Sequence, residues 1–168
     1  MVTTGNVIKS NLTRKGLETF VKSARFLPEA DFVLIGRHMD DSIDYLKAIA
    51  TSNVKFTGYV SLDKLIDYYQ RAKVYVQVSA HEAFGIALGE AMLCECVPVV
   101  TDRGALPEVV GDTGFYVPYG EPEATAEAIS KALNCGKGKE AGERIKEMFP
   151  PEKRERELVM EIEELLEA

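Results

Sequence analysis

The chain has 168 residues, a length typical of one domain with a substantial buried core. Its hydrophobic fraction of 46% and charged fraction of 28% indicate a globular protein, and its formal net charge of −7 argues against a nucleic-acid reader, which usually carries a basic patch. Apolar runs stay well short of the ~20 residues that a membrane span needs, and no signal peptide follows Met1. We therefore expect a cytoplasmic protein without a transmembrane segment.

Strand-like and helix-like segments alternate along the chain. Val- and Ile-rich runs predict buried strands, and apolar residues that recur every three or four positions predict helices between them. The expected strands cover residues 6–10, 31–36, 54–56, 74–78, 97–101 and 114–117. The expected helices cover residues 16–27, 42–50, 84–94, 107–110, 123–133, 139–148 and 153–166, with another after Ser61. This alternation predicts one α/β domain over residues 1–168, with a parallel sheet covered by helices on both faces and a C-terminal helix within residues 151–168.

The three cysteines show no spacing that is typical of metal binding. Cys94 and Cys96 are spaced C-x-C, unlike the C-x2-C of a zinc or redox motif, and Cys135 lies far along the chain. We expect them to be buried, small, apolar thiols. The sequence therefore predicts no metal site.

The most informative segment runs from Glu82 to Glu90, after the expected strand at 74–78. Gly85 permits a tight turn, and a helix is expected to follow it. A strand that leads into a helix N-terminus forms an anion site, because the first backbone N–H groups have no partners within the helix. On a helix, the eight-residue spacing would place the two glutamates about 12 Å apart along the axis and near one face. This predicts a phosphate at the backbone of residues 84–86, with a hydroxyl-rich group near each carboxylate.

This segment resembles the E-x7-E signature of retaining glycosyltransferases with the GT-B fold, in particular those of family 4. Five further segments resemble the same family in the same order, so the resemblance covers roughly residues 5 to 135. These segments are residues 13–17, 31–36, 54–60, 97–110 and 113–118. The resemblance implies a Rossmann-like domain that forms the C-terminal half of a GT-B architecture and binds the nucleotide-sugar donor.

The resemblance also implies how the diphosphate of a donor would be held. Backbone amides at Phe84, Gly85 and Ile86 would bind it, and the ammonium of Lys15 would reach the same phosphates. An ammonium suits this contact, because negative charge builds up on the leaving group during glycosyl transfer. The family usually places an arginine five or six residues before this lysine, where this chain has Ser10 and Lys9. Lys9 is therefore the candidate replacement.

The remaining matched positions imply contacts with the other parts of a donor. Glu90 would accept hydrogen bonds from both ribose hydroxyls, and the main chain of Val60 would contact the nucleobase. Glu82 would contact the hydroxyls of the donor sugar and is the catalytic candidate, because its carboxylate would stabilise positive charge at the anomeric carbon. One departure lies nearby, since Glu95 stands where the family has a glycine after the motif helix.

The implied activity is transfer of a sugar from a UDP-, GDP- or ADP-sugar with retention of configuration and without an obligatory metal or cofactor. Enzymes of this fold bind the acceptor on an N-terminal domain, and 168 residues hold only one domain. We therefore expect the chain to bind a donor but to transfer no sugar without an N-terminal acceptor-binding domain or subunit. Two alternatives stay open: half of a nucleotide-sugar epimerase, and a non-catalytic nucleotide-binding module.

Overall fold

The sheet has the architecture that the sequence predicts. The computed structural model describes the backbone of residues 1–167 and their side chains, apart from those at positions 151, 154, 161 and 167. Within these residues, six parallel strands form one sheet in the order β3-β2-β1-β4-β5-β6, which is the order of a doubly wound, Rossmann-like sheet. The strands are β1 (Val2–Thr4), β2 (Phe32–Ile35), β3 (Val54–Gly58), β4 (Val74–Gln77), β5 (Val97–Thr101) and β6 (Phe115–Val117).

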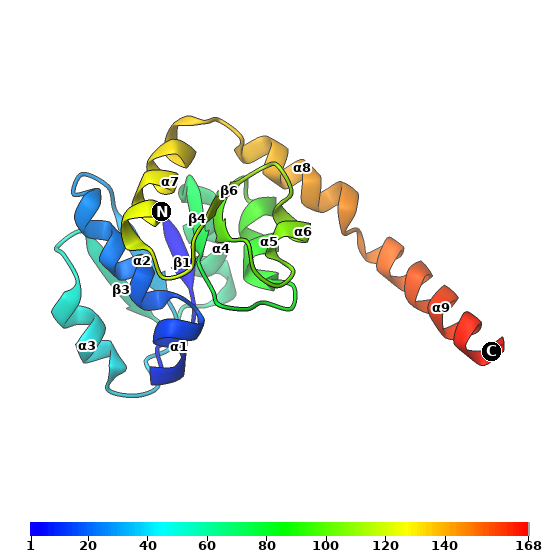
Figure 1. Ribbon diagram of the computed structural model, residues 1–168, viewed down its shortest axis with the longest axis horizontal. Coiled ribbons are helices and arrows are strands. Elements are labelled where there is room, and N and C mark those ends of the chain that lie inside the picture. Colours follow the sequence, from blue (N-terminus) through cyan, green and yellow to red (C-terminus); the bar gives the residue numbers. More distant parts are fainter. Residues whose placement is uncertain (168) are drawn as a thin grey trace.

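Helices cover both faces of this sheet (Figure 1). One face carries α2 (Leu17–Ser23), α3 (Ser42–Ile49) and α7 (Pro122–Asn134), with α1 (Lys9–Arg14) leading into α2. The opposite face carries α4 (Leu62–Arg71), α5 (Ile86–Leu93), α6 (Leu106–Val110) and α8 (Gly138–Met148). The expected α/β class, with a parallel sheet between two helical layers, is confirmed.

Strand β4 shows why the sheet needs both layers. Its side chains alternate between faces, as in any strand, yet all four of its residues are buried. Val74 and Val76 enter the core beneath α2 and α7, whereas Tyr75 enters the core beneath α4 and α5. A strand that is apolar on both sides therefore lies at the centre of the sheet, next to β1.

Two predictions at the N-terminal end are wrong. The first strand is β1, at Val2–Thr4, and residues 6–10 instead contain a single parallel bridge between Val7 and His38 before α1 begins. Val7 is fully buried, so its apolar character reflects core packing and not membership of the sheet. The helix expected over residues 16–27 ends as α2 at Ser23 and continues only as a short 3-10 helix, Ala24–Phe26.

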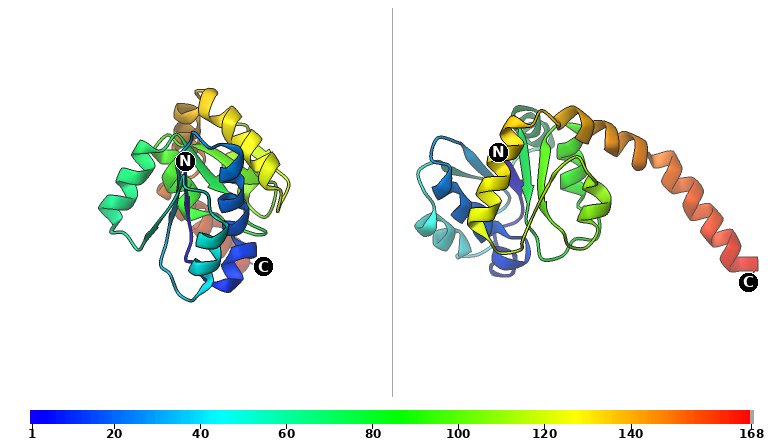
Figure 2. Two further views of the ribbon diagram at one scale, coloured as in Figure 1. Left: turned by 90° about the vertical axis from the view of Figure 1, so that its left-hand side faces the viewer. Right: turned by 45° about the horizontal axis from the view of Figure 1, so that its top comes forward.

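The last helix, α9 (Pro151–Glu167), projects away from the sheet domain in Figure 1 and in the right-hand view of Figure 2. It matches the helix expected at residues 153–166, and the remaining residue of the predicted C-terminal segment, 168, lies outside the described residues. None of the helices in the described part of the chain is long and apolar enough to cross a membrane. The division of the chain into one domain plus this helix stays a prediction.

Candidate functional site

A cavity of about 310 Å³ lies where β1 and β4 end side by side. This is the point at which the strand order reverses, because the chain builds outward through β2 and β3 on one side and through β5 and β6 on the other. Ligands of open α/β sheets bind at such switch points, beyond the carboxyl ends of the strands. The cavity brings together five of the eight predicted site residues: Lys15, Glu82, Phe84, Gly85 and Ile86.

Glu82 lies in the loop between β4 and α5, and not on the helix. The expected helical spacing of Glu82 and Glu90 is therefore wrong, because α5 begins only at Ile86. The Glu82 side chain is buried, and its Oε1 accepts hydrogen bonds from Lys15 Nζ at 2.5 Å and Ser79 Oγ at 2.8 Å. Its Oε2 accepts no hydrogen bond from any described residue. One oxygen is thus held by the protein, and the other is left for a ligand in the cavity.

Ser79 fixes Glu82 from the end of β4. Both Ser79 and Thr101, at the end of β5, are fully buried, and Thr101 Oγ1 donates a hydrogen bond to the Ser79 carbonyl at 2.6 Å. The hydroxyl of Ser79 then donates to the carboxylate, which ties Glu82 to two neighbouring strands of the sheet. Sequence reasoning missed Ser79; its place in the turn after a buried strand and three residues before Glu82 was the available signal.

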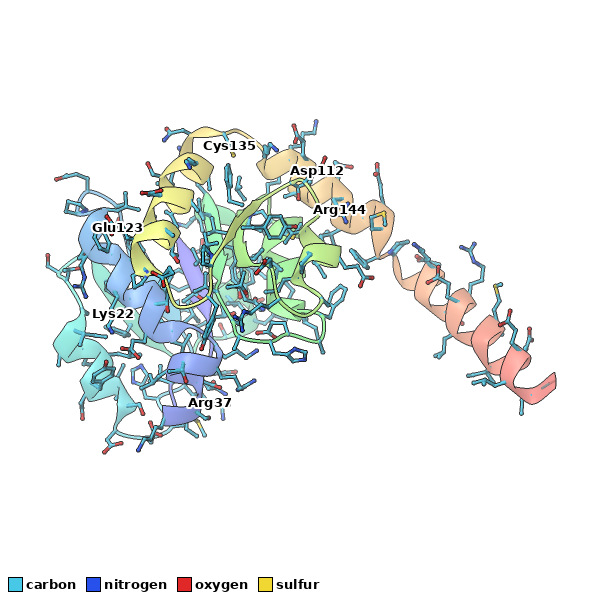
Figure 3. All side chains as sticks on the ribbon, viewed as in Figure 1. Lys22, Arg37, Asp112, Glu123, Cys135 and Arg144 are labelled. Atoms are coloured by element: carbon cyan, nitrogen blue, oxygen red, sulfur yellow. The ribbon has the colours of Figure 1, made fainter. Side chains whose placement is uncertain are left out.

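A second anchor holds the backbone of Glu82. The carbonyl oxygen of Glu82 accepts a hydrogen bond from the Ala105 N–H at 3.0 Å. Gly104 has a φ of +59°, and a Cβ atom there would lie 2.3 Å from the same oxygen, so only glycine allows this close approach. The adjoining helix α6 is held from outside by Arg144, which lies on α8 and donates to the carbonyls of Glu108 and Val109 at 2.7 and 2.9 Å (Figure 3).

Lys15 reaches the cavity from the short connection between α1 and α2. Gly16, which follows it, has a φ of +67°, and a Cβ atom there would lie only 2.1 Å from the Val78 carbonyl oxygen. The Ala80 N–H also donates to the Arg14 carbonyl at 2.8 Å. The lysine loop and the glutamate loop are therefore packed backbone against backbone, although Lys15 and Glu82 are 67 residues apart in sequence.

Helix α5 points its N-terminus at the cavity. Gly85 is the N-cap residue, with a left-handed φ of +86° and no side-chain hydrogen bond to the first turn. The first-turn N–H groups of an α-helix have no partners within the helix, and no acidic residue occupies the first turn of α5. The predicted turn at Gly85 is confirmed, and the arrangement favours an anion at this end of the helix.

Polar side chains from β1 and β4 also line the cavity, and sequence reasoning missed them. The hydroxyl of Tyr75 lies 2.6 Å from Thr4 Oγ1, and both residues line the cavity together with Gln77. Burial raises the pKa of Tyr75 well above its usual range, and the neighbouring phenol of Tyr69 raises it further. The Tyr75 phenol is therefore neutral. Its proton is available for a hydrogen bond to Thr4 or to a ligand.

Three predicted site residues do not line this cavity. Glu90 is exposed on α5, one turn beyond Ile86. Lys9 is exposed at the start of α1, where its backbone N–H donates to Asp40 Oδ2 at 2.9 Å. Val60 packs against the core beneath α4 and α5. Their roles in binding stay predictions. In the described part of the chain, no group of three or more His, Cys, Asp or Glu side chains is placed to hold a metal ion.

Comparison with known proteins places the chain in one family. The model of the family described as "Glycosyl transferases group 1" matches residues 1–135. The chain belongs to this family. Among curated relatives, the capsular polysaccharide biosynthesis glycosyltransferase CapM of Staphylococcus aureus is 32% identical over 141 residues, which cover 77% of this chain and 35% of CapM. The alpha-maltose-1-phosphate synthase of Mycolicibacterium smegmatis is 30% identical over 135 residues, which cover 72% of this chain and 35% of that protein.

Solved structures agree with this assignment. Sucrose-phosphate synthase from Thermosynechococcus elongatus superimposes with a TM-score of 0.83 at 26% identity, covering 99% of this chain and 45% of that one. HepE from Anabaena, in complex with UDP and glucose, superimposes with a TM-score of 0.82 at 20% identity, covering 96% of this chain and 47% of HepE. The Rossmann-like fold of a GT-B half is thereby confirmed. The chain spans about a third of the two curated relatives and about half of the two solved ones.

Proposed function

We propose that this chain is the C-terminal, donor-binding half of a GT-B glycosyltransferase that uses a nucleotide-sugar and retains the anomeric configuration. One observation carries the proposal: Lys15, Glu82 and the N-terminus of α5 meet at a single cavity at the switch point of the sheet. A cation and free N–H groups suit a diphosphate, and a buried carboxylate with one free oxygen suits sugar hydroxyls.

The donor's diphosphate would lie against the backbone at Phe84, Gly85 and Ile86, beside Lys15. Negative charge grows on the leaving diphosphate as the glycosidic bond breaks. Fixed N–H groups and an ammonium stabilise that charge without needing to reorganise, so they act more strongly on the transition state than on the bound donor. Lys9 would add a second, more distant positive charge at the same end of the sheet.

The donor's sugar and nucleoside would extend to either side of the diphosphate. Glu82 would accept hydrogen bonds from sugar hydroxyls through Oε2 and place its negative charge near the anomeric carbon. Glu90, one turn along α5, would accept hydrogen bonds from the ribose hydroxyls, and the main chain at Val60 would contact the base. Because HepE was crystallised with UDP, UDP is the first nucleotide to test.

Transfer would require a second domain for the acceptor, on the same polypeptide or on a partner. The length of the relatives supports this part of the proposal, because the chain covers 45% of sucrose-phosphate synthase and 47% of HepE. The family match does not favour the epimerase or the binding-module alternative. A cytoplasmic location stays a prediction.

Isothermal titration of the purified chain with UDP, GDP and ADP tests donor binding. At least one nucleotide is expected to bind, and Glu90→Ala is expected to weaken it by about 10- to 100-fold, because hydrogen bonds to a charged group contribute about 1.5–3 kcal/mol. Glu123→Ala, on helix α7 (Figure 3), which covers the sheet face opposite to α5, is the matched control and should leave the dissociation constant unchanged. Absence of binding by all three nucleotides, or equal affinity in Glu90→Ala and wild type, would refute donor binding. Efficient sugar transfer by the chain alone would refute the need for a second domain.

A further inference from the structure

The lysine of the candidate anion site is already engaged. Lys15 Nζ lies 2.5 Å from Glu82 Oε1, and the lysine side chain is 27% exposed while the glutamate side chain is 9% exposed. A diphosphate at the start of α5 needs the same ammonium. Any anion that enters the cavity therefore has to draw Lys15 away from Glu82 or share it with that carboxylate.

Glu82 cannot move aside to release the lysine. Its carboxylate is held by the buried Ser79 hydroxyl, and its carbonyl oxygen is held by the Ala105 N–H against Gly104. Lys15, in contrast, sits on a flexible stem with rotatable donors. The moving partner is thus the lysine, and the fixed partner is a buried carboxylate that loses its counter-ion when the lysine leaves. Burying an unpaired carboxylate is costly, so this separation opposes anion binding.

We propose that Glu82 is a specificity-determining residue that competes with a bound diphosphate for Lys15 and so disfavours a nucleoside diphosphate relative to a nucleotide-sugar. The proposal rests on the proposed function, because it assumes a donor diphosphate beside Lys15. A nucleoside diphosphate takes the lysine and leaves the Glu82 carboxylate with the Ser79 hydroxyl but without a counter-ion. The diphosphate of a nucleotide-sugar pairs with the same lysine, but the sugar hydroxyls of this ligand donate hydrogen bonds to the Glu82 carboxylate. The site would then hold the donor more tightly than the product that must leave.

The experiment is a double-mutant cycle on nucleotide affinity. The probe is whichever of UDP, GDP and ADP binds the wild-type chain most tightly by isothermal titration, and the variants are Glu82→Gln, Lys15→Met and the double substitution. Glutamine keeps an acceptor for Ser79 but gives up the charge that holds Lys15. Glu82→Gln is therefore expected to bind the nucleotide about fivefold more tightly, the size of the effect of one partly exposed ion pair. In the Lys15→Met background, the same change should give a smaller gain, because only the direct repulsion between the carboxylate and the diphosphate is then removed.

A matched control separates competition from general electrostatics. Glu108 is an exposed carboxylate on α6, and Glu108→Gln should change nucleotide affinity less than Glu82→Gln does. Thermal unfolding of each variant checks that it is folded. Ser79→Ala offers a second route: it removes the other donor to the Glu82 carboxylate, so Lys15 should be harder to draw away and the variant should bind the nucleotide more weakly than wild type. A Glu82→Gln variant that binds no more tightly than wild type, or that gains equally without Lys15, overturns the competition while leaving donor binding intact. Absence of nucleotide binding in every variant overturns both proposals.

Discussion

Gly104 supports the loop that carries Glu82, and its replacement by alanine is expected to destabilise the domain far more than the same change at Gly120. Both glycines are exposed and have left-handed φ values, +59° and +82°. They differ in surroundings. A Cβ atom at Gly104 would lie 2.3 Å from the Glu82 carbonyl oxygen, whereas a Cβ atom at Gly120 would meet nothing within 4 Å.

The magnitude follows from two separate costs. An alanine held in the left-handed region lowers the free energy of unfolding by about 1–2 kcal/mol. Alanine also restricts the unfolded chain more than glycine does, which raises the free energy of unfolding by about 0.4–1 kcal/mol, so the net loss at Gly120 is about 1 kcal/mol. At Gly104 the clash with backbone adds a further cost of about 1–3 kcal/mol, the range for forcing an extra carbon into a packed site. The expected loss in the free energy of unfolding is therefore about 2–4 kcal/mol.

Thermal and urea unfolding of the two variants measure this difference. For a chain of this size, Gly104→Ala is expected to lower Tm by roughly 6–12 °C and Gly120→Ala by about 2–4 °C. Comparable losses in the two variants would refute the reasoning, because they would show that the contact between Gly104 and the Glu82 backbone carries no stability.

Three further predictions concern stability, reactivity and pH. Glu95→Gly is expected to raise Tm, because Glu95 has a φ of +64°. Holding a non-glycine residue in this left-handed conformation costs about 1–2 kcal/mol, which exceeds the entropic cost of ordering a glycine, about 0.5–1 kcal/mol. A lower Tm would contradict this. Burial raises the pKa of the Cys96 thiol to about 12. In a variant whose other cysteines are replaced by serine, Cys96 should therefore react with iodoacetamide only as fast as the domain opens. Labelling at the rate of a free thiol would contradict its burial. The hydrogen bond from Lys22 lowers the pKa of Glu18 below 4.5, so this carboxylate contributes stability above pH 4.5 that is lost as the pH falls through its folded pKa. The difference in unfolding free energy between wild type and Glu18→Gln should therefore shrink below pH 4.5, and a difference that is independent of pH would refute the pairing.

Much of the fold could be predicted because its signals are local. Strand β4 is apolar on both faces, which is possible only between two helical layers, and the structure confirms it. The turn at Gly85 and the helix after it were also predicted, because a glycine between a strand and an apolar helical run has few other uses. At Glu95, where the resemblance implies a glycine, the backbone has a φ of +64°, a conformation that glycine adopts without strain.

Other features were mistaken or missed because they depend on packing between distant segments. The apolar run at Val7 resembles a strand by composition, yet it enters the core outside the sheet. The distance between Glu82 and Glu90 was predicted from helical geometry, but Glu82 lies in the loop before α5, because the left-handed Gly85 caps this helix three residues after Glu82. Gly104 carries no signature that points to Glu82, because its contact with the Glu82 backbone forms only once β4 and β5 lie side by side.

The sequence by itself determined the class of the fold, the turn at Gly85 and a family resemblance that the comparisons bear out for the family and the fold. Only the tertiary structure decided that Lys15 and Glu82 form an ion pair across one cavity. The physical reason is that hydrophobic periodicity and turn residues act over a few positions, whereas the pairing of β1 with β4 joins segments more than 60 residues apart. Once β1 and β4 are paired, the loop that carries Lys15 packs backbone against backbone on the loop that carries Glu82. This packing brings the ammonium and the carboxylate into contact.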